Sequence, residues 1–246
     1  MPRRQPVPRA AGPAESAGPS TKQRIEQAAL QLFASKGFEA TGIRDIAVQA
    51  GISTAALYHY MGSKDELLID FMLVSMVQLT QVAREALAAA GGPTAELATL
   101  VRAHVGFHML DPQRSLVADD ELRALSDEAF GQVMELRDGY ERIWADTLDR
   151  GLRSSEFRFA DASITRLALL EMCNGVARWY SDQGPKQPIE IADDFAGLAL
   201  AMVDVGQRGG GWHQDQRCMP TGELLELIRR VLREPPGALP QAEVVA

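Results

Sequence analysis

From residue 21 onward the chain repeats apolar positions with the period of an α-helix. In the first such segment, apolar side chains recur three and four positions apart, at Ile25, Ala28, Ala29, Leu32 and Phe33. This spacing places them on one face of a helix, and Gly37 ends the pattern. No segment shows the sustained alternation between turn residues that is typical of a β-strand. The pattern therefore predicts an all-α protein.

Glycine, proline and N-capping residues divide the rest of the pattern into further helices. Gly51 ends one segment, Ser53 and Ser63 are good N-caps, and the run Gly91-Gly92-Pro93 interrupts the chain again. We predict helices over the following ranges: 21–36, 42–50, 53–60, 64–90, 94–110, 113–125, 127–153, 162–181, 189–206 and about 224–232.

Composition and helix pattern divide the chain into four parts. Residues 1–20 are rich in Pro, Ala, Gly and Ser and are expected to be a disordered tail. A head of three short helices at 21–67 precedes a larger helical body at 68–206. Residues 207–246 are expected to be a flexible C-terminal segment with one short helix.

The head has the residue spacing of a helix-turn-helix. Ala47 is followed by Gly51 four residues later and by Leu57 six residues after that. A small residue lets two helices cross closely, and glycine adopts a turn conformation that other residues resist. An aliphatic side chain on the next helix then fills the small core. We therefore interpret this part of the head as a DNA-binding module.

Charge is distributed unevenly between the head and the rest of the chain. Residues 1–64 carry eight Lys or Arg and four Asp or Glu, a net charge of +4, and without residues 1–20 the charge is still +2. The other 182 residues carry 17 basic and 29 acidic residues, a net charge of −12. A basic head on an acidic body suggests that the head alone meets a polyanion.

Four segments of the head carry the most specific pattern. They are Thr41-Gly42-Ile43-Arg44-Asp45-Ile46-Ala47, Ala50-Gly51-Ile52-Ser53, Leu57-Tyr58-His59-Tyr60 and Ser63-Lys64-Asp65-Glu66-Leu67-Leu68. Together they resemble the tetracycline-repressor-like (TetR) family of bacterial regulators, and helix count and spacing extend the resemblance to about residue 206. The resemblance implies that the third helix enters the major groove of operator DNA, where base edges are readable.

The resemblance also implies particular DNA contacts. Thr54, Ala55 and His59 face the bases from the third helix, and Arg44 on the preceding helix reaches a guanine. The implied phosphate contacts are Ser53, Tyr58, Tyr60 and Lys64, and Thr41 is counted among the DNA-binding residues as well. For Tyr60, packing inside the head is an equal alternative.

Two predicted helices of the body, 162–181 and 189–206, are apolar all the way round. Helices of this kind are buried on two sides. One helix-turn-helix contacts about half an operator, so binding a full site needs two copies. We therefore expect a homodimer through these two helices, as the resemblance also implies. The alternative is that they form the centre of a monomeric core.

The body also has the mixture of residues that lines small-molecule sites. Large apolar side chains and polar ones share core-like positions on 94–110 and 127–153, as in ligand pockets. The candidate ligand-binding residues are His104, Phe107, His108, Arg123, Arg137, Tyr140, Glu141, Trp144, Asn174, Arg178 and Trp179. Their segments look like actinobacterial TetR members that sense acyl-coenzyme A thioesters, which implies an effector of that class. For the three arginines, pairing with the abundant carboxylates is the open alternative.

The sequence gives little indication of metal or redox chemistry. His104 and His108 are four residues apart and share a helix face, but a third ligand is not evident and zinc sites need three or four. We therefore expect no metal and no cofactor. Cys173 is expected to pack as a small apolar side chain, and two cysteines cannot form a disulfide framework.

The sequence also favours a cytoplasmic protein without a membrane partner. No apolar run approaches the ~20 residues that cross a bilayer, and residues 1–20 contain no secretory signal.

These features predict a ligand-responsive transcriptional regulator. We expect a homodimeric repressor that binds a palindromic operator in double-stranded DNA and is released by a small molecule. The sequence contains no phosphate-binding glycine loop, no HExxH motif and no nucleophile elbow, so we expect no enzymatic activity. The alternative is a helical small-molecule-binding protein or enzyme that does not bind DNA.

Overall fold

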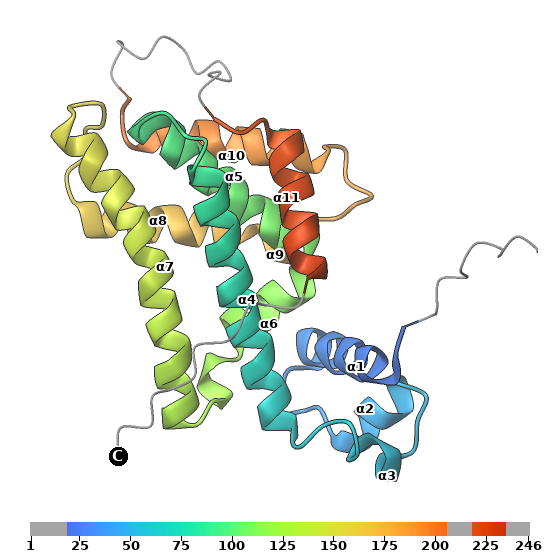
Figure 1. The fold of residues 1–246 in the computed structure, drawn as a ribbon. Helices are drawn as coiled ribbons and strands as arrows, with labels where there is room; N and C mark the ends of the chain where they lie inside the picture. The colour runs from blue at the N-terminus through green and yellow to red at the C-terminus, as the bar shows by residue number, and fades with distance from the viewer. Residues whose placement is uncertain (1–18, 206–217, 235–246) are drawn as a thin grey trace, which may run out of the picture.

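The computed structural model describes residues 19–205 and 218–234, and within these ranges the chain forms helices and no strand. The prediction of an all-α protein is confirmed. Three short helices form the head at one end of the molecule (Figure 1): α1 (Thr21–Lys36), α2 (Ile43–Gln49) and α3 (Thr54–Leu57). The other helices form the body: α4 (Lys64–Leu87), α5 (Pro93–Leu110), α6 (Pro112–Asp120), the 3₁₀ turn η1 (Leu122–Ala124), α7 (Asp127–Arg153), α8 (Ala162–Asn174), α9 (Val176–Trp179), α10 (Pro188–Met202) and α11 (Thr221–Arg233).

Local capping residues determine where the helices of the head begin and end. Ser20 and Gln23 form a capping box at the start of α1, each side chain bonding the backbone N–H of the other. Gly37 ends α1 with φ +87°, and Gly51 joins α2 to α3 with φ +67°. Both values lie in the left-handed region that glycine adopts at little cost. The turn that the spacing around Gly51 predicts is therefore present.

The long helix α4 connects head and body and contributes to the core of each. Its first half supplies Leu67, Leu68, Phe71 and Met72 to the apolar cluster of the head. Its second half supplies Met76, Leu79, Val82, Ala83 and Ala86 to the apolar cluster of the body. Since both halves are buried, a displacement of α4 disturbs both clusters.

By length and composition, α4 alone among the described helices is apolar enough to cross a membrane, with a mean hydropathy of 1.4 in an 18-residue window. The sequence pattern did not single it out as such a run. More than half of that window, 56%, is buried inside the protein. Its apolar character is accounted for by its position between the two clusters.

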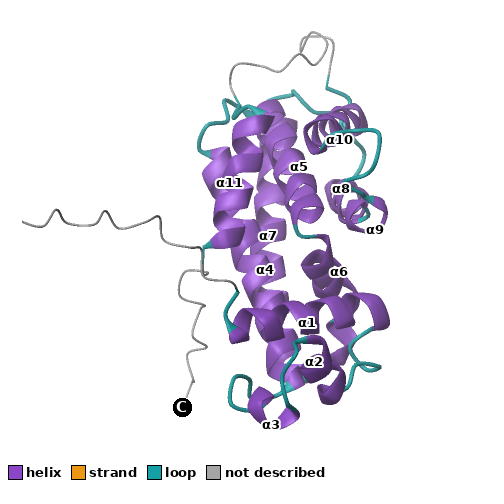
Figure 2. Cartoon of the chain, turned by 90° about the vertical axis from the view of Figure 1, so that its right-hand side faces the viewer, coloured by secondary structure: helices purple, strands orange, loops and turns teal. Residues whose placement is uncertain are grey.

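The head does not have a core of its own. Its apolar cluster also contains Val117 and Ala118 of α6 and Val133 of α7. Helix α6 lies directly against α1 (Figure 2), so the body covers one side of the head.

Two predicted helices end earlier than expected, 189–206 at Met202 and 64–90 at Leu87, and three others differ more. The third helix ends at Leu57 and not near Tyr60, because the chain turns there and places Met61 in the core of the head. The predicted helix 113–125 is divided into α6 and η1. The predicted helix 162–181 is divided at Gly175, where the backbone bond from Arg178 N–H closes a tighter turn on the glycine carbonyl.

The helix predicted near 224–232 is part of the body's core. Helix α11 buries Leu224, Leu225, Leu227, Ile228 and Val231 against α4 and α5. A Cβ atom on Gly106 of α5 would lie 2.8 Å from Ile228 Cδ1, so this glycine allows the close approach. The Gln78 amide of α4 donates to the carbonyls of Val231 and Glu234 at the end of α11. Residues 221–233 are therefore a structural element, whereas the predicted flexibility of 207–217 and 235–246 falls outside the described residues.

Replacing Ile228 with alanine should lower the free energy of unfolding by about 2–5 kcal/mol, because it leaves a cavity between α11 and α5. Denaturant titration followed by circular dichroism measures this. The exposed Glu226→Ala on the same helix is the matched control and should change it by less than about 0.5 kcal/mol. Equal, small effects of both substitutions would contradict the docking of α11.

Candidate nucleic-acid interface and effector cavity

The helix-turn-helix of the head is held by buried apolar side chains. Ile46 and Ala47 of α2 and Leu57 of α3 are almost fully buried, as the spacing predicts. Ser53 begins α3 by accepting a hydrogen bond from Ala56 N–H at 3.1 Å. The outer surface of α3 is thereby fixed relative to α2.

Most of the predicted DNA contacts lie on the open surface of the head. Arg44, Ala55 and His59 are exposed, and Thr54 is partly exposed. Tyr58 and Tyr60 expose 59% and 50% of their surface. Tyr60 is therefore not enclosed in the head, although about half of its surface is covered, and the phosphate contacts of both tyrosines stay predictions. Ser53 is exposed too, although its Oγ is occupied by the cap of α3.

The prediction that Thr41 is a DNA-binding residue is not supported for its side chain. Its side chain is only 1% exposed, and its hydroxyl donates to the Gly37 carbonyl at 2.8 Å. The residue closes the loop between α1 and α2 from the inside, so its side chain does not reach the surface on which DNA would lie.

Lys64 has an internal role that the sequence did not indicate. Its ammonium group donates to the carbonyls of Phe38 and Thr41, at 2.9 and 3.1 Å, and lies 3.9 Å from the centre of the Phe38 ring. The lysine thus ties the α1–α2 loop to the start of α4. These two bonds use two of the three ammonium donors, so the phosphate contact of Lys64 stays a prediction.

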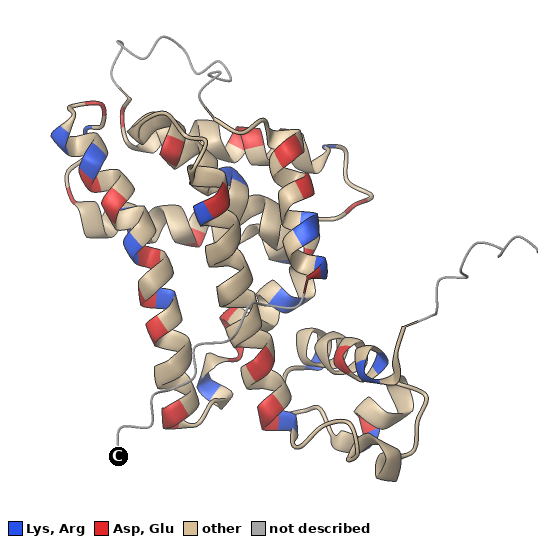
Figure 3. Cartoon of the chain, in the orientation of Figure 1, with Lys and Arg blue, Asp and Glu red and all other residues tan. Residues whose placement is uncertain are grey.

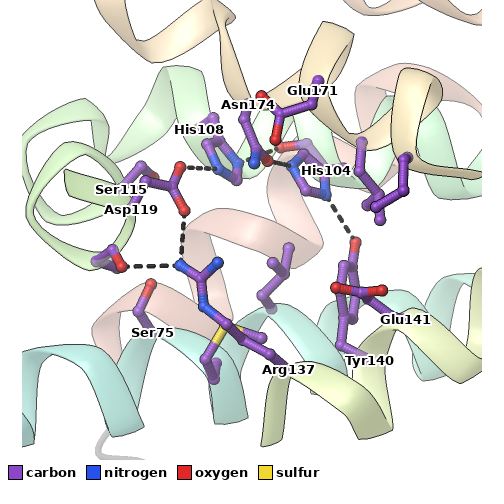
Figure 4. Close-up of a pocket in the computed structure, with 15 residues that line it drawn as sticks. Ser75, His104, His108, Ser115, Asp119, Arg137, Tyr140, Glu141, Glu171 and Asn174 are labelled. Atoms are coloured by element: carbon purple, nitrogen blue, oxygen red, sulfur yellow. Dashed lines mark hydrogen bonds and ion pairs between the residues drawn. The ribbon is translucent and has the colours of Figure 1, made fainter. Parts of the chain in front are cut away.

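The body contains a cavity between α4, α5, α6, α7 and α8 (Figure 4). It has a volume of about 90 Å³ and is open at one side. Apolar side chains form part of the wall, and polar ones converge on the interior. The lining consists of Ser75, Met76, Leu79, His104, His108, Ser115, Ala118, Asp119, Arg137, Tyr140, Glu141, Leu167, Leu170, Glu171 and Asn174.

His104 is the centre of a buried polar network in this cavity. Its Nδ1 lies 2.9 Å from the Tyr140 hydroxyl, and its Nε2 lies 2.7 Å from Asn174 Oδ1. Since the amide oxygen only accepts, Nε2 carries the proton and the Tyr140 hydroxyl donates to Nδ1. Burial lowers the pKa of His104 well below its usual value, and the neighbouring His108 acts in the same direction. Burial also raises the pKa of Tyr140. Both groups are therefore neutral at physiological pH.

A second group links α5, α6 and α7 at the other side of the cavity. His108 stacks on His104 with ring centres 4.2 Å apart, and its Nε2 lies 3.7 Å from Asp119 Oδ2. Arg137 donates to Asp119 Oδ1 at 2.9 Å and to the Ala118 carbonyl at 2.8 Å. Burial by itself raises the pKa of Asp119, but His108 and Arg137 outweigh it and hold the pKa below its usual value. The carboxylate is therefore charged and anchors α6 to α7.

The structure brings six of the eleven predicted ligand-binding residues into the cavity lining: His104, His108, Arg137, Tyr140, Glu141 and Asn174. Phe107 and Trp144 are fully buried in the body's core and do not line the cavity, although Trp144 packs edge-on against His104. These two are therefore supporting residues.

Three further predicted residues lie outside the cavity because they are on the surface. Arg123 is exposed on η1. Arg178 is exposed and forms a bidentate ion pair with Asp120, with the shorter contact at 2.5 Å. Trp179 is more than half exposed and stacks on Phe195 at 6.1 Å. For Arg178 the structure shows the ion pair that was the alternative to a role in the cavity. Carboxylates available for such pairs are frequent on the body helices, where charges of both signs are visible in Figure 3.

Several polar lining residues were missed by sequence reasoning. Ser75 interrupts the apolar face of α4 at a core position, and such a polar residue in an apolar stripe is a usable signal. Ser115 is 2% exposed, and its hydroxyl makes no hydrogen bond with the described residues. Asp119 gives no signal in sequence, because its partners lie on other helices.

No group of three or more His, Cys, Asp or Glu side chains that could hold a metal ion occurs in residues 19–205 and 218–234. Cys173 is fully buried in the core of the body, where burial raises the pKa of its thiol. It packs there with apolar neighbours.

Comparison with known proteins finds a matching family for the head and another for the body. Residues 25–71 match the family described as "Bacterial regulatory proteins, tetR family", and residues 90–203 match "Tetracyclin repressor-like, C-terminal domain". The HTH-type transcriptional repressor KstR2 of Rhodococcus jostii is 28% identical over 194 residues, which cover 76% of this chain and 94% of that protein.

Two solved structures show the same arrangement. The TetR family transcriptional regulator PfmR from Thermus thermophilus is 32% identical with a TM-score of 0.65, over 72% of this chain and 97% of that one. AibR, solved in complex with isovaleryl coenzyme A and operator DNA, has a TM-score of 0.65 at 19% identity, over 73% of this chain and 97% of that one. This second likeness is one of fold alone.

The chain belongs to the TetR family of bacterial transcriptional regulators. The prediction of a DNA-binding helix-turn-helix head on a ligand-binding helical body is confirmed at the level of the family. Because its relatives are transcriptional regulators, the chain is not an enzyme.

The neutral state of His104 predicts a pH dependence of stability. The unfolded chain takes up a proton on this histidine below a pKa of ~6.5, whereas the folded chain does not. Stability is therefore fully present above pH ~6.5 and falls below it, by at most about 1.4 kcal/mol per pH unit from this group. Denaturant titrations between pH 5 and 8 measure the slope.

His104→Gln should remove this part of the slope, because glutamine has no proton to gain. The exposed His59→Gln is the matched control in the head and should keep the wild-type slope. An unchanged slope in His104→Gln would contradict the assignment.

Proposed function

We propose that this protein is a cytoplasmic homodimeric repressor that binds a palindromic operator and is released by an acyl-coenzyme A thioester. The observation that carries this proposal is the position of α4. One half of α4 packs in the DNA-binding head, and the other half supplies Ser75, Met76 and Leu79 to the wall of the cavity. A ligand in the cavity therefore touches the helix that holds the head.

The surface of the head supports operator binding. Arg44, Ala55 and His59 are exposed on α2 and in the α3 turn, where they can reach base edges. Tyr58 and Tyr60 present hydroxyls suited to phosphate contacts. Phosphate contacts orient the head, and the base contacts select the sequence.

An exposed apolar surface supports the dimer. Helices α8, α9 and α10 lie together on one side of the body (Figure 2). They expose the following large apolar side chains: Ile164, Leu167, Trp179, Ile189, Leu198 and Met202. A surface of this kind on a soluble chain is typical of an association site. A second copy would cover it and place two heads on one operator.

The cavity supports an effector with an apolar chain and a carbonyl group. Met76, Leu79 and Leu170 offer apolar contacts to an acyl chain, and the buried Ser115 hydroxyl is available to a ligand oxygen. KstR2 is named a repressor, and AibR was solved with isovaleryl coenzyme A.

The charges of the lining limit which part of the thioester enters the cavity. The carboxylates of Asp119, Glu141 and Glu171 line it against the single guanidinium of Arg137. The phosphates of coenzyme A are therefore expected to stay outside, with only the acyl end within.

The test is DNA binding with purified protein from which bound small molecules have been stripped. Fluorescence anisotropy on the gene's own upstream region should show tight binding by two chains per site, with weaker binding to random duplex. Octanoyl-coenzyme A should release the DNA, whereas free coenzyme A should not. The lack of any preference for the upstream fragment, with and without acyl-coenzyme A, would contradict the proposal.

Arg44→Ala sharpens this test, since it removes a candidate base contact. It should weaken binding to the upstream fragment about tenfold or more, and it should weaken binding to random duplex much less. The exposed Arg142→Ala on α7, distant from the head, is the matched control and should leave both unchanged.

Ile164→Glu tests the dimer. Ile164 is 65% exposed, so the substitution costs little in a monomer but places an unpaired carboxylate in the proposed interface. Sedimentation velocity should show a dimer for the wild type and a monomer for the variant at micromolar concentration. Leu152→Glu, at an exposed apolar position on α7, should remain dimeric. A monomeric wild type would contradict the dimer.

A further inference from the structure

One residue of the body holds the recognition head by a direct hydrogen bond. Glu121 ends α6, and its Oε1 accepts the backbone N–H of Phe38 at 3.0 Å, across 83 residues of sequence. Phe38 lies in the loop between α1 and α2, and its side chain is 3% exposed. The bond therefore joins the body to the loop that leads into the helix-turn-helix.

The same loop is held from the opposite side. The Lys64 ammonium donates to the Phe38 carbonyl at 2.9 Å, so both polar groups of this residue are bound by charged side chains. Gly37 precedes Phe38 with φ +87°, a backbone conformation that glycine adopts at little cost, and a Cβ atom there would be in ordinary contact with Glu121 Oε1 at 3.4 Å. We call this arrangement of Glu121, Phe38 and Lys64 the loop clamp.

Glu121 of the loop clamp follows closely after the part of α6 that lines the cavity. Ala118 and Asp119 of α6 line the cavity, and Arg137 of α7 binds the carbonyl of the first and the carboxylate of the second. Glu121 follows Asp119 by two residues. A shift of α6 at the cavity wall therefore moves the carboxylate that holds the head.

We propose that Glu121 is a positioning residue for operator binding, and that α6 carries a change at the Asp119–Arg137 pair to the head through the loop clamp. The proposal rests on the proposed function and adds a second route beside α4. Glu121 itself contacts no DNA. It fixes the loop between α1 and α2, and through that loop the angle of the recognition helix.

The first experiment compares three variants by anisotropy on the upstream fragment at several salt concentrations. Glu121→Ala removes the acceptor and should weaken binding about tenfold, since bonds to charged groups are the stronger ones. The slope of affinity against salt should stay unchanged, because no phosphate contact is lost. Glu121→Gln keeps an acceptor oxygen and should bind within about twofold of the wild type. Glu135→Ala, at an exposed position on α7, should match the wild type.

Hydrogen exchange separates positioning from general loss of stability. In Glu121→Ala, peptides covering residues 37–42 should exchange faster, while peptides from α8 and α10 keep the wild-type rate. Wild-type DNA affinity together with wild-type exchange in this variant would overturn the proposal, as would equal acceleration throughout the protein.

A double-mutant cycle tests the connection to the cavity. Asp119→Asn weakens the pair with Arg137 and should also weaken DNA binding, but it should have little further effect when Glu121 is already alanine. Full additivity of the two substitutions would overturn the route through α6.

If wild-type protein shows no preference for the upstream fragment, the proposed function fails, and the exchange experiment still decides the clamp. Faster exchange confined to 37–42 in Glu121→Ala supports the contact as a holder of the head. Unchanged exchange overturns it.

Discussion

Burial of α4 along its length, first against the head and then against the body, is the interaction on which the rest of the structure depends. Phe71 and Met72 pack in one apolar cluster, and Leu79 and Val82 pack in the other. Each cluster loses buried apolar surface if the helix moves alone, so the helix and its neighbours shift together. This is the physical condition under which a ligand in the body can change the angle of the head.

The cavity next to α4 contains neutral polar groups, which makes it adaptable. His104 and Tyr140 are buried and bonded to each other, and neither carries a charge at physiological pH. A ligand oxygen can exchange partners with such groups without leaving a buried charge unpaired. The charged pair of Asp119 and Arg137 belongs to the same lining, where it joins α6 to α7.

Sequence reasoning found the elements that depend on local signals and missed those that depend on tertiary contacts. The glycine turn at Gly51 follows from residue spacing alone, and so do most helix boundaries. The docking of α11 through Ile228 was not predicted, because its amphipathic pattern does not reveal which surface it covers. Arg178 was a candidate ligand-binding residue with an ion pair as the alternative, and only the structure shows that Asp120 pairs with it at the surface. Asp119 was overlooked because its partners, His108 and Arg137, lie on other helices.

The apolar cluster that the head shares with α6 and α7 limits how regulators of this kind can be recombined. A chimera that carries only residues 21–67 on a foreign scaffold would keep the exposed side chains of α2 and α3 but lose the cover that Val117 and Val133 provide. The chimera would be expected to keep the DNA sequence preference of the head, but it would not respond to small molecules that bind the body. A transplant that preserves switching has to include the α6 surface as well, so the exchangeable unit is discontinuous in sequence.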